Sequence, residues 1–384
     1  MISLYASVGA NLTHYHLDVE AGTLTRQATV ALPEDIHYVW PHASKKYLYV
    51  ASSDRPPRST VGTSHHLTAM TIAASGALSP HGEPVRLPAR PVHVCTDIPS
   101  THALVAFTHP SDLRVYDIKA DGTLGGEVAQ AGPVDAGIFA HQVRVTADNR
   151  LAVLVTRGND AAGGKPEDPG ALKVFKYRDG QLSDVASIAP KGGYGFGARH
   201  LDFHPTKPWV YVSIERQNQI AMFRREGDAI VPEPAFIKDS LQGPWNKRTH
   251  QLAGTVHVHP KGHVVYNINR AYTPVDVGGG RQAVPGGENN IAVYKIDPAT
   301  GEPTAIQHMD TRGLYCRTFH IDPSGRLLVA ANIISLDYQD AGGAITTVPA
   351  SLALFRIADD GKLEYLRKYD VDVGAKTMFW MGMV

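Results

Sequence analysis

The chain of 384 residues carries 37 Lys and Arg against 37 Asp and Glu, so its formal net charge is zero. This balance gives no global signal for binding to nucleic acid or to an anionic membrane surface. The content of 36 Gly and 26 Pro is typical of a chain with many turns rather than of a helix bundle. The two cysteines, Cys95 and Cys316, are too few for a disulfide framework and favour a reducing compartment.

The first segment, MISLYASVG, predicts a β-strand rather than a signal peptide, because no Lys or Arg precedes its short apolar run. No run in the chain approaches 18 apolar residues, so we expect no membrane span. These features predict a soluble cytoplasmic protein.

After this strand a repeat recurs six times. Each copy has a short alternating strand, a turn rich in Pro, Asp, Ser, Gly or Lys, and an apolar second strand, which is the pattern of a hairpin. A third strand and a weaker fourth strand follow each hairpin. The hairpins are HYVWPHASKKYLYVAS, HVCTDIPSTHALVAFT, HQVRVTADNRLAVLVT, RHLDFHPTKPWVYVSI, GTVHVHPKGHVVYNIN and RTFHIDPSGRLLVAAN.

The two ends of the chain complete a seventh unit. The segment AKTMFWMGMV resembles an inner strand without a partner, and MISLYASVG resembles a second strand without a predecessor. Joining them closes a ring and removes free sheet edges. We therefore predict an all-β fold, a seven-bladed β-propeller with four antiparallel strands per blade, as a single domain over residues 1–384. A pair of β-sandwiches is the alternative, but the even spacing and the complementary ends argue against it.

Basic residues recur at fixed positions of this repeat. Counted from the turn residues Ala43, Pro99, Ala147, Pro205, Pro260 and Pro323, two columns stand out. The first column, six residues before the turn, contains His37, His93, His141, Arg199, Gly254 and Arg317. The second column, ten residues after it, contains Ser53, His109, Arg157, Glu215, Arg270 and Ile333. Inner strands begin and second strands end on one face of a propeller, so we expect both columns to meet in a funnel at the channel mouth.

A bracing network inside each blade, like that of WD repeats, is another explanation for recurring polar residues. Such a network would repeat one residue type evenly. The mixture of His, Arg and Gly in the first column, with a lone Glu in the second, favours a binding or catalytic site.

The segment GARHLDFHP and the following VYVSIERQNQIAMF resemble the signature G-x-R-H-x-x-F-H-P…Y-x-x-x-E-x-x-x-x-x-x-x-F of the seven-bladed propeller lactonases. That family includes bacterial 6-phosphogluconolactonases and fungal carboxymuconate lactonizing enzymes. The resemblance covers the chain through repeats such as DPSGRLLVAAN. It implies a lactonase of carbohydrate metabolism whose site holds a His, two Arg and a Glu in a cleft at the channel mouth.

By motif position the resemblance implies His141, Arg199 and Glu215 as catalytic residues. Arg270 and Arg317 both fit the second arginine; we assign Arg270 to catalysis and Arg317 to substrate binding. Several arginines hold a carboxylate or phosphate in bidentate fashion, which predicts a small anionic lactone or carboxylate as partner. We expect a monomer or a small homo-oligomer. The predicted substrate-binding residues are His37, His93, His200, Arg157, His250 and Arg317.

Opening a lactone with water needs a base near the water and donors near the developing oxyanion. Glu215 or His141 fits the base, and an arginine fits the oxyanion. Neighbouring cations should keep Glu215 ionised and lower the pKa of His141. The same groups serve the reverse ring closure, so a muconate-type cycloisomerase or another isomerase is the second interpretation. A non-catalytic propeller that binds a partner over the channel is the third.

Neither a metal nor an organic cofactor is expected. His257 and His259 in VHVHPKGH lie at i and i+2, with His204 and His320 at related positions, but a third zinc ligand is not evident. GYGFGA fits G-x-G-x-x-A, yet a strand rather than a helix follows it. Four long Gly/Pro-rich loops, at 54–66, 157–170, 270–290 and 335–349, should rise over the face that carries the funnel.

Overall fold

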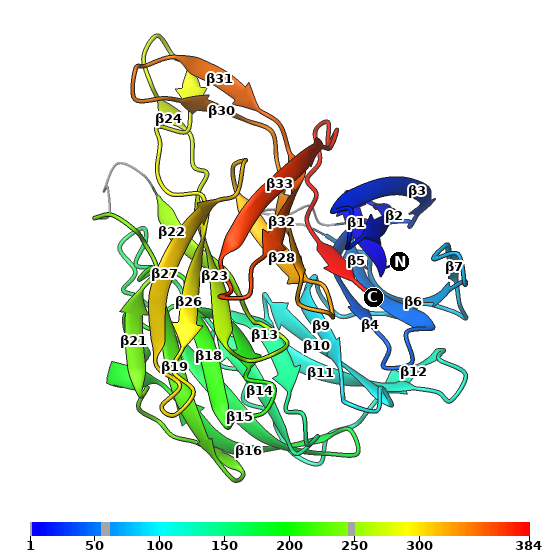
Figure 1. Ribbon diagram of the computed structural model, residues 1–384. Helices are drawn as coiled ribbons and strands as arrows, with labels where there is room; N and C mark the ends of the chain where they lie inside the picture. Colours follow the sequence, from blue (N-terminus) through cyan, green and yellow to red (C-terminus); the bar gives the residue numbers. More distant parts are fainter. Residues whose placement is uncertain (1, 55–61, 245–249) are drawn as a thin grey trace.

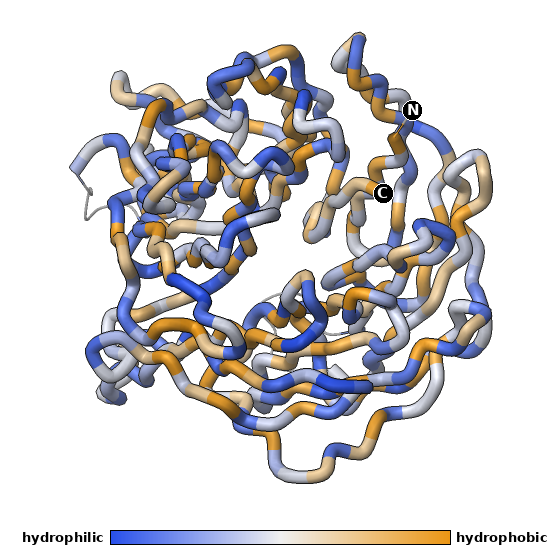
Figure 2. The backbone as a smooth tube through the Cα atoms, turned by 60° about the horizontal axis from the view of Figure 1, so that its bottom comes forward, coloured by the Kyte–Doolittle hydropathy of each residue, from blue (hydrophilic) through white to orange (hydrophobic). Residues whose placement is uncertain are grey.

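The computed structural model describes residues 2–54, 62–244 and 250–384. Seven antiparallel sheets, the blades, surround a central axis (Figure 2), which confirms the predicted seven-bladed β-propeller. Within these ranges the helical structure is limited to a short 3-10 turn, η1 (Pro190–Gly193). No helix there is long and apolar enough to span a bilayer.

Blades 1 to 6 each run from the axis outward in chain order, and contacts between their first strands join each of these blades to the next. In blade 1 the outer position is divided between two short strands. Blades 1 to 3 comprise β4 (Asp35–Pro41), β5 (Tyr47–Ser53), β6 (His65–Ile72), β7 (Leu78–Pro80) and β8 (Val85–Arg86); β9 (Pro91–Thr96), β10 (His102–Thr108), β11 (Ser111–Ile118) and β12 (Leu124–Glu127); and β13 (Ala140–Val145), β14 (Leu151–Thr156), β15 (Ala171–Arg178) and β16 (Gln181–Ile188).

Blades 4 to 6 follow the same order, and blade 4 again divides its outer position. Blades 5 and 6 each carry an extra hairpin between the second and third strands of the sheet. These blades comprise β17 (Ala198–Phe203), β18 (Trp209–Ile214), β19 (Gln219–Glu226), β20 (Ala229–Ile230) and β21 (Phe236–Asp239); β22 (Gln251–Val258), β23 (Val264–Ala271), β26 (Asn290–Ile296) and β27 (Pro303–Asp310), with the hairpin β24 (Val275–Asp276) and β25 (Gln282–Ala283); and β28 (Cys316–Ile321), β29 (Leu327–Asn332), β32 (Ser351–Ile357) and β33 (Leu363–Asp370), with the hairpin β30 (Leu336–Gln339) and β31 (Ile345–Val348).

Blade 7 joins strands from the two ends of the chain, as predicted. The order is β34 (Met381–Met383), β1 (Ile2–Val8), β2 (Asn11–Asp18) and β3 (Thr23–Ala31), and both ends lie close together in Figure 1. Trp380 fixes this closure: its backbone carbonyl accepts a hydrogen bond from Ser7 N at 2.8 Å, and its backbone N donates to Ser7 Oγ at 3.0 Å.

The second strand of each blade is buried because neighbouring blades cover both of its faces. In β14 and β18 every residue is buried, and their sequences LAVLVT and WVYVSI are rich in the β-branched and aromatic side chains that pack well on a pleated surface. Outer strands such as β16 are largely exposed. The core is therefore divided into layers between adjacent blades.

Tyrosines on the second strands connect neighbouring blades. Each donates its hydroxyl hydrogen to a glycine carbonyl in the turn between the third and fourth strands of the next blade. A buried hydroxyl that finds such a partner stabilises the contact by about 0.5–1.5 kcal/mol. These bonds are Tyr5 to Gly76 at 2.7 Å, Tyr49 to Gly122 at 3.1 Å, Tyr211 to Gly301 at 2.8 Å, and Tyr266 to Gly361 at 2.8 Å.

The histidines considered above as metal ligands have structural partners. Nε2 of His204 lies 2.8 Å from the Gly262 carbonyl, and Nε2 of His259 lies 2.9 Å from the Gly325 carbonyl. Both contacts join one blade to the next. No group of three His, Cys, Asp or Glu side chains suited to a metal ion occurs among the residues that the structure describes.

In blades 1, 3, 4 and 6 a shift of strand register near the start of the inner strand leaves one residue unpaired. His37, His141, Arg199 and Arg317 are each passed over in the pairing of their inner strand with the second strand. A residue left unpaired in this way is typical of a β-bulge, which re-aims its side chain.

In blade 2 the first predicted column is wrong by one residue. Ala106 pairs with His93 and Phe107 pairs with Pro91, so Val92 holds the unpaired position and not His93. His93 is instead equivalent to Tyr38 and His200, which follow the unpaired residues of blades 1 and 4. The strand pairing aligns Ile98, not Pro99, with the turn residue Pro205 of blade 4, so a column counted from Pro99 falls one residue too late in blade 2.

Two of the long loops contain hairpins that pair with each other. Val284 beside β25 donates its backbone N–H to the Asp337 carbonyl at 2.8 Å, and Gln339 N donates back to the Val284 carbonyl at 2.9 Å. The hairpins β24–β25 and β30–β31 project from one end of the molecule (Figure 1), the end where the second strands finish. Most of the predicted loop at 54–66 lies outside the described residues.

Candidate active site

A cavity of about 370 Å³ lies at the end of the channel where the inner strands begin. This volume falls in the range of about 300–1,000 Å³ that is typical of small-molecule sites. Both predicted columns reach it. The lining residues are Arg90, Val92, Thr108, His109, Phe139, His141, Arg157, Arg199, Glu215, Leu252, Arg270, Tyr272, Tyr315, Arg317 and Phe379.

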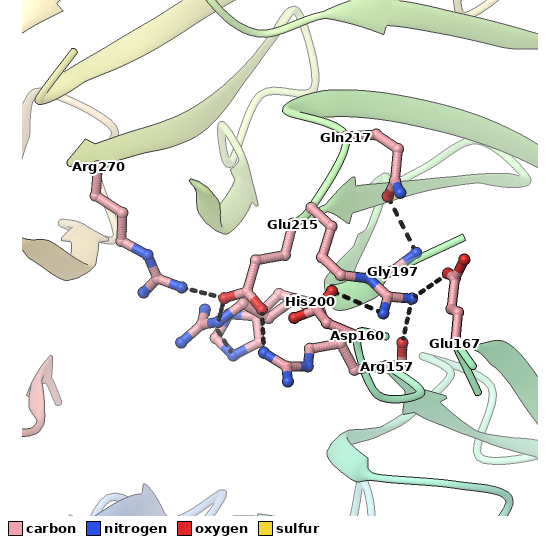
Figure 3. Close-up of polar contacts among 10 residues, drawn as sticks. Arg157, Asp160, Glu167, Gly197, His200, Glu215, Gln217 and Arg270 are labelled. Atoms are coloured by element: carbon pink, nitrogen blue, oxygen red, sulfur yellow. Dashed lines mark hydrogen bonds and ion pairs between the residues drawn. The ribbon is translucent and has the colours of Figure 1, made fainter. Parts of the chain in front are cut away.

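Glu215 lies at the centre of the cavity's ion pairs (Figure 3). Its Oε1 lies 2.9 Å from Nε of Arg199 and also contacts Nη2 of Arg270, and its Oε2 lies 3.0 Å from Nη1 of Arg157. Arg157 follows β14, Arg199 lies in β17 and Arg270 lies in β23. One carboxylate therefore connects blades 3, 4 and 5.

The charges of this cluster shift its pKa values strongly. Burial alone would raise the pKa of Glu215, but Arg270, Arg199 and Arg157 outweigh that effect and lower the pKa to about 2. Burial and the charge of Arg270 lower the pKa of Arg199 to about 9. Glu215 is thus an ionised carboxylate at neutral pH, as predicted from its neighbours.

A second network supports the loop that carries Arg157 (Figure 3). Arg216 donates to the Arg157 carbonyl at 3.1 Å, to Glu167 Oε1 at 2.9 Å and to Asp160 Oδ1 at 3.0 Å. The side chain of Arg216 is only 8% exposed. These bonds fix the Arg157 carbonyl and the loop that follows it, and so support the position from which the Arg157 guanidinium contacts Glu215.

Aromatic rings back three of the cavity arginines. The guanidinium carbon of Arg157 lies 4.1 Å from the Phe139 ring centroid, and that of Arg317 lies 3.6 Å from the Phe379 centroid. Arg270 lies 5.6 Å from the Tyr315 centroid. Such cation–π contacts orient a guanidinium and contribute about 0.5–2 kcal/mol each.

Two of these aromatic residues have an unusual backbone conformation. Phe139 has φ of 59° and Tyr315 has φ of 54°, in the left-handed region that bulky side chains rarely adopt. Both residues come two positions before an unpaired inner-strand residue, His141 and Arg317 respectively. Strain of this kind is concentrated at functional sites.

Tyr272 and Tyr315 form a stacked pair at the wall of the cavity. Their ring centroids are 3.6 Å apart and their planes differ by 4°. Asn289 supports both, because its Oδ1 accepts hydrogen bonds from the backbone N of Tyr315 at 3.0 Å and of Ala271 at 3.3 Å. The pair presents a flat apolar surface beside Arg270.

His141 lines the cavity and is 8% exposed. Burial and the charges of Arg199, Arg317 and Arg157 lower its pKa well below the ordinary value of 6.5. Its imidazole is therefore neutral at neutral pH, which confirms the predicted direction. The imidazole of His200 lies beneath it, with ring centroids 5.2 Å apart.

The remaining predicted binding residues lie away from the cavity lining. His37, His93 and His200 are buried in the channel wall, with Nδ1 of His37 3.3 Å from Nη1 of Arg90. His250 is exposed, and its Nδ1 lies 3.3 Å from Oγ1 of Thr273. Of the six predicted substrate-binding residues, only Arg157 and Arg317 reach the cavity.

Sequence reasoning missed the rim of the cavity. Arg90, Phe139, Leu252 and Tyr315 all line it, and the first, second and fourth stand two positions before Val92, His141 and Arg317. A third column at this offset becomes visible once blade 2 is shifted by one residue. Tyr272 and Phe379 have no equivalent signal in the repeat.

The family model described as lactonase, 7-bladed beta-propeller, matches residues 1–337. The chain belongs to the seven-bladed β-propeller lactonase family. This membership confirms the predicted family and the predicted enzyme class, a lactonase.

Curated relatives and solved structures are similar to this chain, the solved structures in their fold. The 6-phosphogluconolactonase of Bacillus subtilis (strain 168) is 25% identical over 286 residues, covering 69% of this chain and 70% of the relative. The 6-phosphogluconolactonase of Erwinia tasmaniensis is 24% identical over 355 residues, covering 92% and 90%. The periplasmic gluconolactonase of Pseudomonas aeruginosa has the same fold, with a TM-score of 0.74 and 18% identity over 100% of this chain and 99% of its own. A Lactobacillus plantarum protein gives a TM-score of 0.73 at 23% identity, with 100% of both chains covered.

Proposed function

We propose that this lactonase hydrolyses the lactone of a sugar acid that carries an anionic group, in the manner of a 6-phosphogluconolactonase. The observation that carries the proposal is charge: five arginines and one glutamate line the cavity, a formal excess of four positive charges. A neutral lactone gains nothing from that excess, whereas a phosphate or carboxylate is held by guanidinium groups in bidentate fashion. The names of the curated relatives support the phosphorylated substrate.

In this proposal His141 acts as the general base. Its neutral imidazole accepts a proton from the attacking water while the water oxygen bonds to the lactone carbonyl carbon. Arg199 stabilises the resulting oxyanion. When the bond between that carbon and the ring oxygen breaks, His141 returns its proton to the departing alkoxide, and the product is an open hydroxy acid.

Glu215 has a positioning role in this scheme rather than that of a base. A carboxylate with a pKa of about 2 that contacts three guanidiniums is a weak proton acceptor at neutral pH. It offsets part of the arginine charge and fixes the positions of Arg199 and Arg270. We also propose that residues 1–384 act as one domain, because blade 7 takes strands from both ends of the chain.

The test is proton release from 6-phosphogluconolactone, gluconolactone and muconolactone by the wild type, by Arg199→Ala and by Arg178→Ala. Arg178 is the control because its side chain is 92% exposed. We expect hydrolysis of the phosphorylated lactone, its loss in Arg199→Ala and unchanged activity in Arg178→Ala. Muconolactone turnover alone would favour the muconate-type reaction, and an enzyme that leaves all three lactones intact would overturn the proposal.

A further inference from the structure

Arg317 differs from Arg157, Arg199 and Arg270 in its partners. Those three arginines contact Glu215, whereas no acidic side chain among residues 2–54, 62–244 and 250–384 forms an ion pair with Arg317. Nη1 of Arg317 donates to the Phe379 backbone carbonyl at 2.9 Å. Arg317 is therefore a cavity arginine without a carboxylate partner in the described part of the chain.

Burial makes this situation costly for the protein alone. Arg317 is 6% exposed, and burial lowers its pKa to about 10. A buried cation without an opposite charge destabilises the folded state until a counter-charge arrives. At a cavity, that counter-charge can come from a ligand.

The surroundings of Arg317 fix the direction in which it offers hydrogen bonds. At 3.6 Å from the ring centroid, Phe379 covers one face of the guanidinium, and the Phe379 carbonyl occupies one donor. The other donors are available on the side of the cavity, which Arg317 lines. A planar guanidinium in a fixed orientation suits the oxygens of a phosphate or carboxylate.

Arg317 also lies on a different side of the channel from the proposed base, although its charge still acts on His141. It lies in β28 of blade 6, whereas His141 lies in β13 of blade 3, three blades away around the ring. A lactone whose carbonyl is near His141 therefore meets Arg317 with a substituent remote from that carbonyl.

We propose that Arg317, backed by Phe379, is the subsite that binds the remote anionic substituent of the substrate and sets the preference for charged over neutral lactones. This inference rests on the proposed function for the nature of the substrate. The shared ligand chemistry is an oxyanion on the sugar acid, either a phosphate ester or a second carboxylate.

The first test measures binding by isothermal titration, independently of turnover, with 6-phosphogluconate, gluconate and inorganic phosphate. Arg317→Gln should weaken binding of 6-phosphogluconate about tenfold or more and of gluconate much less. The matched control is Arg144→Gln, because Arg144 also lies against an aromatic ring, 5.2 Å from the Trp40 centroid, but pairs with Asp202 at 3.2 Å outside the cavity. Equal affinity of wild type and Arg317→Gln for 6-phosphogluconate would overturn the subsite.

The second test compares kcat/KM for the phosphorylated and neutral lactones in each variant. The ratio of kcat/KM for the phosphorylated lactone to that for the neutral lactone should fall about tenfold in Arg317→Gln. A lactone that carries a carboxylate in place of the phosphate ester shows which of the two oxyanions Arg317 binds. Arg317→Lys, which keeps the charge without the planar fork, should show an intermediate ratio and guards against a folding defect. An equal loss on both lactones would place Arg317 at the reacting centre and overturn the inference. If the wild type opens no lactone but still binds 6-phosphogluconate through Arg317, the proposed function fails while the subsite stands.

Discussion

Arg199 and Glu215 form an ion pair in which Nε lies 2.9 Å from Oε1, although both side chains are almost completely buried, with exposures of 3% and 4%. Their strands belong to blade 4, and Arg157 and Arg270 reach the same carboxylate from blades 3 and 5. The cluster is therefore a connection between blades as well as a part of the candidate site. Removing its one negative charge should affect both folding and binding.

Glu215→Gln should destabilise the protein by about 3–5 kcal/mol at neutral pH, because it removes the counter-charge of the buried Arg199 and Arg270 and of the partly exposed Arg157. Urea unfolding measures this difference. Asp179→Asn is the control, since Asp179 is 90% exposed in its pair with Arg178, and should have no measurable effect.

Wild type and Glu215→Gln can also be compared at different pH values. The pKa of Glu215 is lowered from 4.5 to about 2, so its contribution is complete above pH 4.5 and is lost as the pH falls toward 2. The stability difference between wild type and Glu215→Gln should shrink across that interval. A difference that does not vary with pH would contradict the ion-pair explanation.

His93 should make stability depend on pH in a different range. Burial and the charges of Arg144, Arg317 and Arg199 lower its pKa well below 6.5, so below pH 6.5 the unfolded chain binds a proton that the folded chain excludes. Stability therefore falls as the pH drops below 6.5, by about 1.4 kcal/mol per pH unit for each such histidine. His93→Phe should reduce the measured slope by one proton; an unchanged slope would mean that His93 is protonated in the fold.

The pH profile of turnover tests His141. Because its pKa is lowered by burial and by Arg199, Arg317 and Arg157, kcat/KM for the phosphorylated lactone should stay constant down to pH 6.5 and decline only below it. Arg317→Gln removes one of these cations and should move the acid limb to higher pH. A limb at or above pH 6.5 in the wild type would argue against His141 as the base.

The stacked tyrosines should contribute to substrate binding through their apolar surface. Tyr272→Ala removes one ring of the pair, whose centroids are 3.6 Å apart, and should raise KM for the lactone about 2- to 10-fold, the equivalent of about 0.5–1.5 kcal/mol. Tyr272→Phe keeps the stack and should remain close to the wild type. Equal KM values for the Ala and Phe variants would show that the stack has no part in binding.

Ring closure depends on Trp380. Its side chain is 3% exposed and packs with Tyr5, Ile36 and Val39 between blades 7 and 1. Trp380→Ala should reduce the free energy of unfolding by about 3–5 kcal/mol. Tyr194→Ala, at a residue 56% exposed, is the control for loss of an aromatic side chain, and similar effects of the two changes would contradict the closing role.

The repeat made the fold predictable because each hairpin has the same alternation of apolar and turn residues. It also placed His141, Arg199 and Glu215 at one end of the channel, since residues at equal positions of equal blades occupy equal places around the axis. The prediction failed where the turn residue was wrongly aligned. Val92 rather than His93 lies at the cavity because Ile98, not Pro99, is the residue of blade 2 that is equivalent to Pro205, and the proline in HVCTDIPS suggests the wrong alignment.

The role of Glu215 was only partly accessible from sequence. Column positions predicted that cations surround it, but the contacts from three blades depend on side-chain directions that the repeat does not specify. Distinguishing Arg317 from Arg270 needed the same information. Arg270 contacts Glu215, whereas Arg317 is held by the carbonyl of Phe379, 62 positions further along the chain.

The closure of blade 7 has a consequence for synthesis on the ribosome. Ser7 and Trp380, which hydrogen-bond across that blade, are 373 positions apart in sequence. β1, β2 and β3 are translated before the other six blades and β34 after them, so the inner edge of β1 stays unpaired while those six blades are made. An exposed strand edge is a site for wrong pairing, and the nascent chain therefore carries an aggregation-prone edge until β34 emerges.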